Sequence, residues 1–87
     1  MTYKVILTHD ALADLEFWKK HDKGVFDKIG ALLKSIVVDP TNGIGKPERL
    51  RYKNENMWSR RITREHRLVY LVEKEVVYVL ECRFHYK

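Results

Sequence analysis

The fold is decided by residues 58–83, WSRRITREHRLVYLVEKEVVYVLECR, where apolar residues recur with the two-residue period of a strand. Short polar turns, EH and EKE, divide the stretch at the spacing of hairpins. The segments LVYLV and VVYVL are apolar on both faces, which favours central strands that carry helices on one side. We therefore expect antiparallel strands at 58–64, 67–73 and 75–83.

The first of these strands carries an arginine on each face. Trp58, Arg60 and Ile62 share one face because successive side chains alternate, and Arg61 lies on the other. Arginine is seldom fully buried in proteins. At least one face of the sheet is therefore expected to stay in contact with water.

Two helices are expected between an N-terminal strand and the sheet. Residues 2–8 are rich in β-branched side chains and predict the strand, after which Thr8 caps a helix at about 9–21. Asp22 caps a second helix, in which apolar residues follow the i, i+3, i+4, i+7 pattern. That helix must end before the Asp-Pro pair at 39–40, because proline disfavours helical geometry in the preceding residue.

A long loop follows the helices. DPTNGIGKPER, residues 39–49, holds both prolines and two of the four glycines, and RLRYK at 49–53 predicts one further strand. The chain therefore predicts an α+β fold of order β-α-α-β-β-β-β, with two N-terminal helices packed on an antiparallel-rich sheet. Its 87 residues have no material for a second core, so residues 1–87 are expected to form one domain.

Composition excludes several kinds of protein. No apolar run approaches the ~18 residues that a membrane span needs, and the N-terminus lacks the features of a signal peptide. The single cysteine, Cys82, has no partner for an internal disulfide. Its predicted strand face, shared with Tyr78 and Leu80, favours an inert core thiol over a nucleophile. We therefore expect a cytosolic protein without a membrane segment.

The chain also shows no motif for a metal or a nucleotide. Its four histidines have no short ligand spacing, and neither HExxH nor CxxC occurs. NGIGKPE, at 42–48, lacks the GKS or GKT ending of a phosphate loop and precedes a strand rather than a helix. No cofactor is therefore expected.

The net charge of +5 is located in one 22-residue window, residues 46–67. This window holds eight basic and three acidic residues, whereas the charges on either side of it cancel. Six of the eight bases are arginine, whose planar fork suits phosphate better than the point charge of lysine. An anionic partner, foremost a nucleic acid, is therefore expected, and a solvated basic face is the alternative.

Residues in and after this basic window supply the parts of a metal-free ribonuclease. Such a reaction needs a base for the ribose 2′-hydroxyl proton, an acid for the leaving 5′-oxygen, cations for the phosphorane and a surface that stacks the base. A carboxylate, a histidine, arginines and a tyrosine provide these parts. Because most small basic proteins contain such residues, surface ion pairs and plain packing remain alternatives. The set is Lys46, Glu48, Arg51, Arg61, Arg67, His85 and Tyr86.

Three motifs occur in order along the second half of the chain, GKPERLRY at 45–52, WSRRITREHRLVY at 58–70 and CRFHYK at 82–87. Together they resemble the YoeB (Txe) family of bacterial toxins, within the RelE/ParE toxin superfamily, over nearly the whole chain. The resemblance implies a RelE-like fold and a ribosome-dependent mRNA endonuclease that cuts codons in the A site of the 70S ribosome. It also implies frequent homodimers and a cognate antitoxin of the YefM type. The basic window is expected to contact ribosomal RNA, whose dense phosphates need only charge and shape.

The resemblance also implies a role for each site residue. Glu48 corresponds to the proposed general base, Arg67 to the group that steadies the phosphate, His85 to the proposed general acid and Tyr86 to the side chain that orients or stacks the substrate. Lys46, Arg51 and Arg61 would bind substrate in the same site. Two departures from the family pattern are visible, since Phe84 stands where relatives usually have tyrosine and Lys87 extends past the usual end.

Rival functions come from the same superfamily. ParE-type relatives share the fold but inhibit DNA gyrase, and they lack the acid and base that Glu48 and His85 would provide. A plain RNA-binding module is a third alternative. The acid-base set favours the nuclease.

Overall fold

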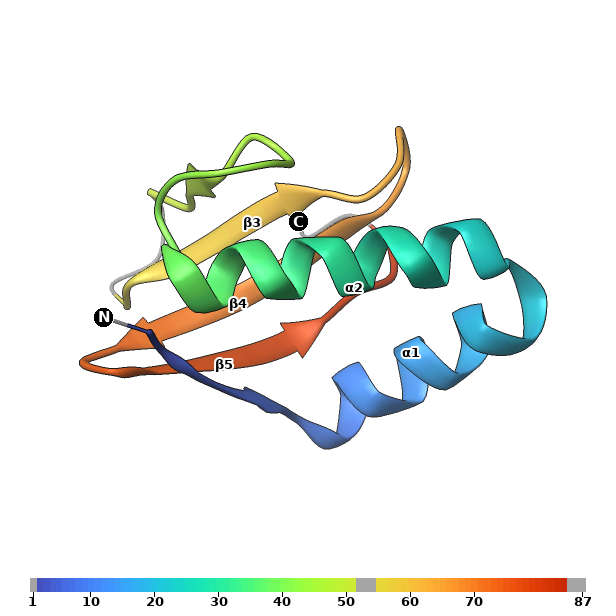
Figure 1. Cartoon of the computed structure of the whole chain (residues 1–87), viewed down its shortest axis with the longest axis horizontal. Helices are drawn as coiled ribbons and strands as arrows, with labels where there is room; N and C mark the ends of the chain where they lie inside the picture. Colours follow the sequence, from blue (N-terminus) through green and yellow to red (C-terminus); the bar gives the residue numbers. More distant parts are fainter. Residues whose placement is uncertain (1, 52–54, 85–87) are drawn as a thin grey trace.

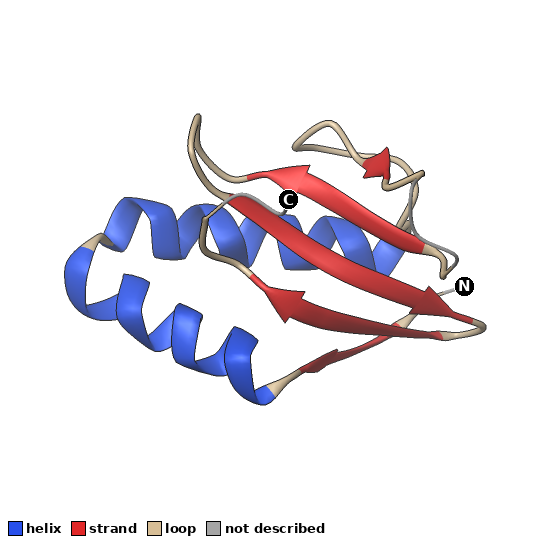
Figure 2. Ribbon diagram, turned by 180° about the vertical axis from the view of Figure 1, so that it is seen from behind, coloured by secondary structure: helices blue, strands red, loops and turns tan. Residues whose placement is uncertain are grey.

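The computed structural model describes residues 2–51 and 55–84. The five strands form one sheet in the order β1-β5-β4-β3-β2, with β1 parallel to β5 and the other neighbours antiparallel. Both helices cover the same face (Figure 1), and Figure 2 shows the opposite, helix-free face in front of them. The expected α+β order is confirmed. The elements are β1 (Lys4–Leu7), α1 (His9–His21), α2 (Lys23–Val38), β2 (Glu48–Arg49), β3 (Met57–Arg61), β4 (Arg67–Glu73) and β5 (Val76–Glu81).

The helices begin and end where the sequence predicts. At the start of α1 the Thr8 hydroxyl accepts a hydrogen bond from the Ala11 N–H at 3.2 Å, and at the start of α2 Asp22 accepts from the Val25 N–H at 3.1 Å. The last residue of α2 is Val38, one residue before the Asp-Pro pair. Neither of the described helices is long and apolar enough to cross a membrane.

Apolar side chains are buried on both faces of the sheet. A smaller cluster on the helix-free face joins Leu50, Met57 and Val69 with the partly buried Leu71 and Leu80. Burying one such side chain stabilises the fold by about 1.5–3 kcal/mol. The two central strands are therefore apolar on both sides, as predicted. The main core, between helices and sheet, includes Ala11, Trp18, Ile29, Leu32 and Ile36 from the helices and Leu68, Tyr70, Val77 and Val79 from β4 and β5.

Arg60 is fully buried, which is rare for arginine, whereas Arg61 on the other face is exposed, so that face stays in contact with water as expected. The Arg60 Nε donates to the Tyr70 hydroxyl at 3.0 Å, and one Nη donates to the Ser35 hydroxyl at 2.7 Å. The other donors reach the carbonyls of Asp39, Asn42 and Ile44 at 2.7, 2.9 and 3.0 Å. All five guanidinium N–H groups are thereby satisfied without an acid. Arg60 therefore fixes the loop that follows α2 against β3.

Gly45 brings this loop back onto the end of β3. Its carbonyl accepts a hydrogen bond from the Arg61 N–H at 2.7 Å. Its φ of +83° lies in the left-handed region, and a Cβ there would stand 2.6 Å from Leu32 Cδ2. Glycine is the residue that tolerates both the conformation and the close approach. Lys46 and Glu48 are the first and third residues after Gly45, so this turn sets the position from which both side chains project.

Four of the five strands are shorter than predicted, and β1 covers Lys4–Leu7 instead of residues 2–8. β3 ends at Arg61 because residues 62–66 form a turn, in which the N–H groups of Ile62 and Thr63 both donate to the His66 carbonyl at 2.9 and 3.2 Å. The strand predicted at 49–53 is observed as the two-residue β2. Positions 52–54 of that prediction lie outside the described residues.

Cys82 packs on the helix side of the sheet, so its predicted face, shared with Tyr78 and Leu80, is wrong. The register of β4 against β5 shifts between Val69 and Tyr70, which leaves Leu80 as an extra residue. Beyond this β-bulge, the residues of β5 that face the helices come one position later than strict alternation predicts. Burial, aided by nearby carboxylates, raises the pKa of the Cys82 thiol to about 12. The expected inert core thiol is therefore confirmed.

Candidate active site

Three of the predicted site residues share the helix-free face of the sheet. Glu48 of β2 pairs with Ser59 of β3, and Arg61 pairs with Arg67 of β4. Ser59 and Arg61 face the same way because alternate residues of a strand do, and their cross-strand partners share that face. Val69, the partner of Ser59 in β4, belongs to the apolar cluster on the helix-free side. The fold therefore brings Glu48, Arg61 and Arg67 together on that side.

The spacing of these three residues suits a nucleotide. Opposite residues of an antiparallel pair have Cβ atoms about 4.5–5.5 Å apart, and diagonal neighbours roughly 7–8 Å. Arg61 and Arg67 are opposite, whereas Glu48 is diagonal to Arg61. Glu48 and Arg61 are exposed, and Arg67 is half-buried. Two guanidinium groups and one carboxylate can thus reach the same phosphate and its neighbouring ribose.

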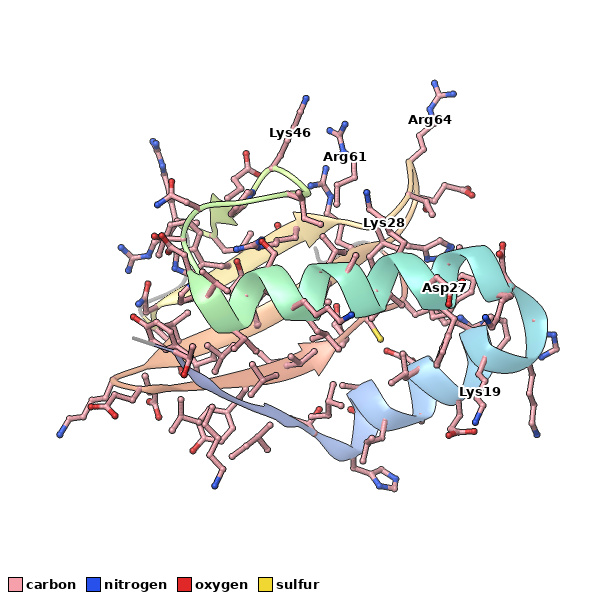
Figure 3. All side chains as sticks on the ribbon, in the orientation of Figure 1. Lys19, Asp27, Lys28, Lys46, Arg61 and Arg64 are labelled. Carbon is pink, nitrogen blue, oxygen red and sulfur yellow. The ribbon has the colours of Figure 1, made fainter. Side chains whose placement is uncertain are left out.

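Lys46 lies beside Arg61 because the carbonyl of the preceding Gly45 is hydrogen-bonded to the Arg61 N–H. Figure 3 shows the side chains of Lys46, Arg61 and Arg64 projecting outward from one edge of the molecule. Arg64, in the turn between β3 and β4, was not among the predicted site residues, although it belongs to the basic window. This edge therefore presents three cations next to the helix-free face.

Arg51 stands apart from the arginine pair. It follows Leu50, whose N–H donates to the Met57 carbonyl at 2.9 Å, at the start of β3. Arg61 occupies the opposite end of the same strand. The ladder therefore brings Arg51 to the side of Glu48 that faces away from Arg61.

Among the described residues, the charged side chains of this site form no ion pairs, so they are available to a ligand. Within residues 2–51 and 55–84, the only ion pair shorter than 4 Å joins Lys23 and Asp27 on α2, at 3.3 Å. The alternative in which Arg61 or Arg67 forms a surface pair with Glu65 or Glu81 is therefore not observed there. Burial is the main cause of the raised pKa of Glu81, and the remaining causes are carboxylates of α1 rather than an arginine.

The end of the described chain is tied to the site. The Phe84 carbonyl accepts from the backbone N–H of Arg67 at 3.1 Å, and the Phe84 N–H donates to His66 Nδ1 at 2.7 Å. Upstream, the Cys82 carbonyl accepts from Trp18 Nε1 at 2.9 Å. Because β5 ends at Glu81, these bonds anchor the segment, and the expected continuation of the strand to residue 83 is wrong.

His85 and Tyr86 lie outside the described residues. Their assigned roles therefore stay predictions. Phe84, the residue that precedes them in the sequence, is held beside Arg67 by its carbonyl.

A hollow elsewhere on the molecule does not coincide with this site. It measures about 520 Å³ and is lined by Glu73, Lys74, Val76 and Tyr78 around the turn between β4 and β5. Glu48, Arg61 and Arg67 are not part of its lining. This hollow therefore lies apart from the candidate site.

The chain is similar to a family of bacterial toxins. Residues 7–86 match the family model described as a YoeB-like toxin of bacterial type II toxin-antitoxin systems. Toxin YoeB of Escherichia coli strain K12 is 41% identical over 83 residues, which cover 95% of this chain and 99% of the relative.

Solved structures agree with this match. A YoeB dimer from Staphylococcus aureus superposes with a TM-score of 0.85 at 38% identity, and a heterotetrameric YoeB-YefM toxin-antitoxin complex from the same organism with 0.82 at 38%. Each comparison covers 99% of this chain and 100% of the other. The archaeal RelE-RelB complex from Pyrococcus horikoshii reaches 0.77 at 16% identity, covering 97% of this chain and 96% of that one, a likeness of fold alone. The expected RelE-like fold is confirmed.

Proposed function

Because the chain belongs to the YoeB-like toxins of bacterial type II toxin-antitoxin systems, we propose that it is a ribosome-dependent endonuclease that cuts mRNA in the A-site codon. One observation supports this most strongly. Glu48, Arg61 and Arg67 share the helix-free face, and the chain reaches Phe84 beside Arg67, directly before His85 and Tyr86 in the sequence.

The proposed reaction needs no metal. Glu48 takes the proton of the ribose 2′-hydroxyl, whose oxygen attacks the adjacent phosphorus. The bond from phosphorus to the 5′-oxygen of the next nucleotide breaks, and His85 protonates that oxygen. Arg61 and Arg67 stabilise the charge on the phosphorane, and Tyr86 orients or stacks the base. The products are a 2′,3′-cyclic phosphate and a 5′-hydroxyl.

The remaining basic residues bind RNA in this proposal. Lys46 and Arg51 flank Glu48 in the sequence and contact the mRNA backbone, whereas Arg64 extends the positive edge towards ribosomal RNA. Phosphate contacts of this kind position a protein without reading sequence. Action on ribosomes places the protein in the cytosol.

A cognate antitoxin has to mask this face. The S. aureus YoeB-YefM complex supports a partner of the YefM type, and the positive edge suits an acidic segment of that partner. The S. aureus YoeB dimer likewise supports a homodimer for this chain.

The experiment that tests this function uses purified protein and ribosomes programmed with a defined mRNA. We expect a cut within the codon in the A site, and no cut at that position with His85→Ala at the same concentration. Binding to the ribosome without a cut would contradict the nuclease and leave an RNA-binding module. Inhibition of DNA gyrase without a cut would instead favour a ParE-like toxin.

A further inference from the structure

His66 lies in the middle of the second family-like motif but has no assigned role. Its ring nitrogen Nδ1 accepts a hydrogen bond of 2.7 Å from the backbone N–H of Phe84, 18 residues later in the chain. We propose that His66 is a positioning residue for RNA cleavage, which sets the direction in which the chain leaves Phe84 towards His85. The inference rests on the proposed function.

Phe84 needs outside support to keep its conformation. Its φ of 67° lies in the left-handed region. Residues other than glycine rarely adopt this conformation, because it brings Cβ close to the following carbonyl oxygen. Both polar groups of its backbone are held, the N–H by His66 and the carbonyl by the Arg67 N–H. Because a peptide unit is planar, holding the carbonyl also limits the direction of the next bond.

His66 is itself held on a hydrogen-bonded turn. Thr63 Oγ1 accepts from the backbone N–H groups of Glu65 and His66 at 3.2 and 3.1 Å. The His66 ring meets the Trp18 ring edge-on with 4.7 Å between centroids, and lies 5.5 Å from the ring of Phe84. A residue fixed by its backbone and by packing on two sides can hold a neighbour in place.

The contact requires an acceptor at one ring position. Nδ1 accepts only with an unshared electron pair, so the neutral ring carries its proton on Nε2. An asparagine side chain places its amide oxygen near the position of Nδ1, whereas the longer glutamine reaches towards Nε2. These two amides form a matched pair that separates the hydrogen bond from polarity alone.

His66 acts through Phe84 and does not touch the RNA in this account. Arg67, the next residue, supplies both the second bond to Phe84 and the side chain next to Arg61. His66 and Arg67 are consecutive, so the segment that carries the catalytic arginine also holds Phe84, the residue before His85 in the sequence. Small displacements of such groups matter, since a shift of about 1 Å can cost about 10²-fold in rate.

The test compares His66→Gln and His66→Asn in single-turnover cleavage of ribosome-bound mRNA. We expect His66→Gln to slow the cutting step about 10- to 100-fold with unchanged ribosome affinity, and His66→Asn to regain most of the rate. Amide hydrogen exchange of Phe84 should be faster in His66→Gln than in His66→Asn.

The outcomes separate this role from the proposed function. A wild-type chain that leaves the mRNA uncut overturns the proposed function and this role with it. A cutting wild type, with the two variants equally slow or both equal to it, overturns only the role of His66. Equal exchange of the Phe84 amide in all three chains also overturns it.

Discussion

Arg67→Ala is expected to slow single-turnover cleavage of ribosome-bound mRNA by about 10²- to 10³-fold, and by at least as much as Glu48→Ala. The loss arises because Arg67 is half-buried beside Arg61, where part of the surrounding water is excluded. A cation placed at the phosphorane acts most strongly in such surroundings. The truncation leaves the negative charge of the transition state without one of its two nearest cations.

The expected loss in Glu48→Ala is smaller for a physical reason. Glu48 is exposed on the two-residue strand β2, so a water molecule can enter the space left by its carboxylate. General-base catalysis contributes about 10²- to 10⁴-fold, and we expect Glu48 at the low end. Arg67→Lys, which keeps the charge without the planar fork, should fall between Arg67→Ala and the wild type.

The measurement is the rate of the cutting step at saturating protein, with both alanine variants assayed on the same ribosomes. Lys19→Ala is the matched control, because it removes one positive charge from an exposed position on α1 (Figure 3). A Glu48→Ala chain that is clearly slower than Arg67→Ala would contradict the ranking.

Arg60→Met is expected to destabilise the fold by about 3–5 kcal/mol. The substitution removes five hydrogen-bond donors at once and leaves Tyr70, Ser35 and three loop carbonyls short of a partner. Each buried polar group without a partner costs about 1–3 kcal/mol, and water can restore some of them after the loop relaxes. The loop that carries Lys46 and Glu48 should loosen with it.

Urea unfolding of Arg60→Met and of Arg61→Met measures this effect. Arg61 is the neighbouring residue on the opposite face and is exposed, so its substitution should change the unfolding free energy by no more than about 0.5 kcal/mol. Arg60→Lys should recover little, since one ammonium group cannot reach all five acceptors. A loss below about 1 kcal/mol in Arg60→Met would show that the network does not hold the loop.

Local signals predicted most of the fold. Thr8, Asp22 and the Asp-Pro pair act on the residues next to them, so both helices could be placed closely from the sequence. The strand at 67–73 was also placed correctly, because a run that is apolar on both faces has few alternatives in a chain of this size.

The features that the sequence did not predict correctly, or did not predict at all, depend on contacts between distant segments. The face of Cys82 follows from a bulge that only the pairing of β4 with β5 creates. The burial of Arg60 follows from carbonyls 16 to 21 residues earlier, which the loop brings to it. Its position between Trp58 and Ile62 on an apolar face was the signal that could have shown it.

The candidate site was likewise predictable from the sequence only in part. The family-like motifs predicted Glu48, Arg61 and Arg67 as site residues, and the pairing of β2, β3 and β4 brings these three to one face. The anchoring of Phe84 by His66 could not be predicted, because residues in two different motifs meet only after folding. The roles of His85 and Tyr86 remain predictions.

The most direct measurement is cleavage of an mRNA that lacks one oxygen atom. A single 2′-deoxy nucleotide is placed on the 5′ side of the phosphate that is cut in the A-site codon, and the mRNA is otherwise unchanged. We expect no cut at that phosphate, because the attacking hydroxyl is absent, while the protein still binds the programmed ribosome. A cut at the same phosphate and at the same rate as in the all-ribose mRNA would contradict the account.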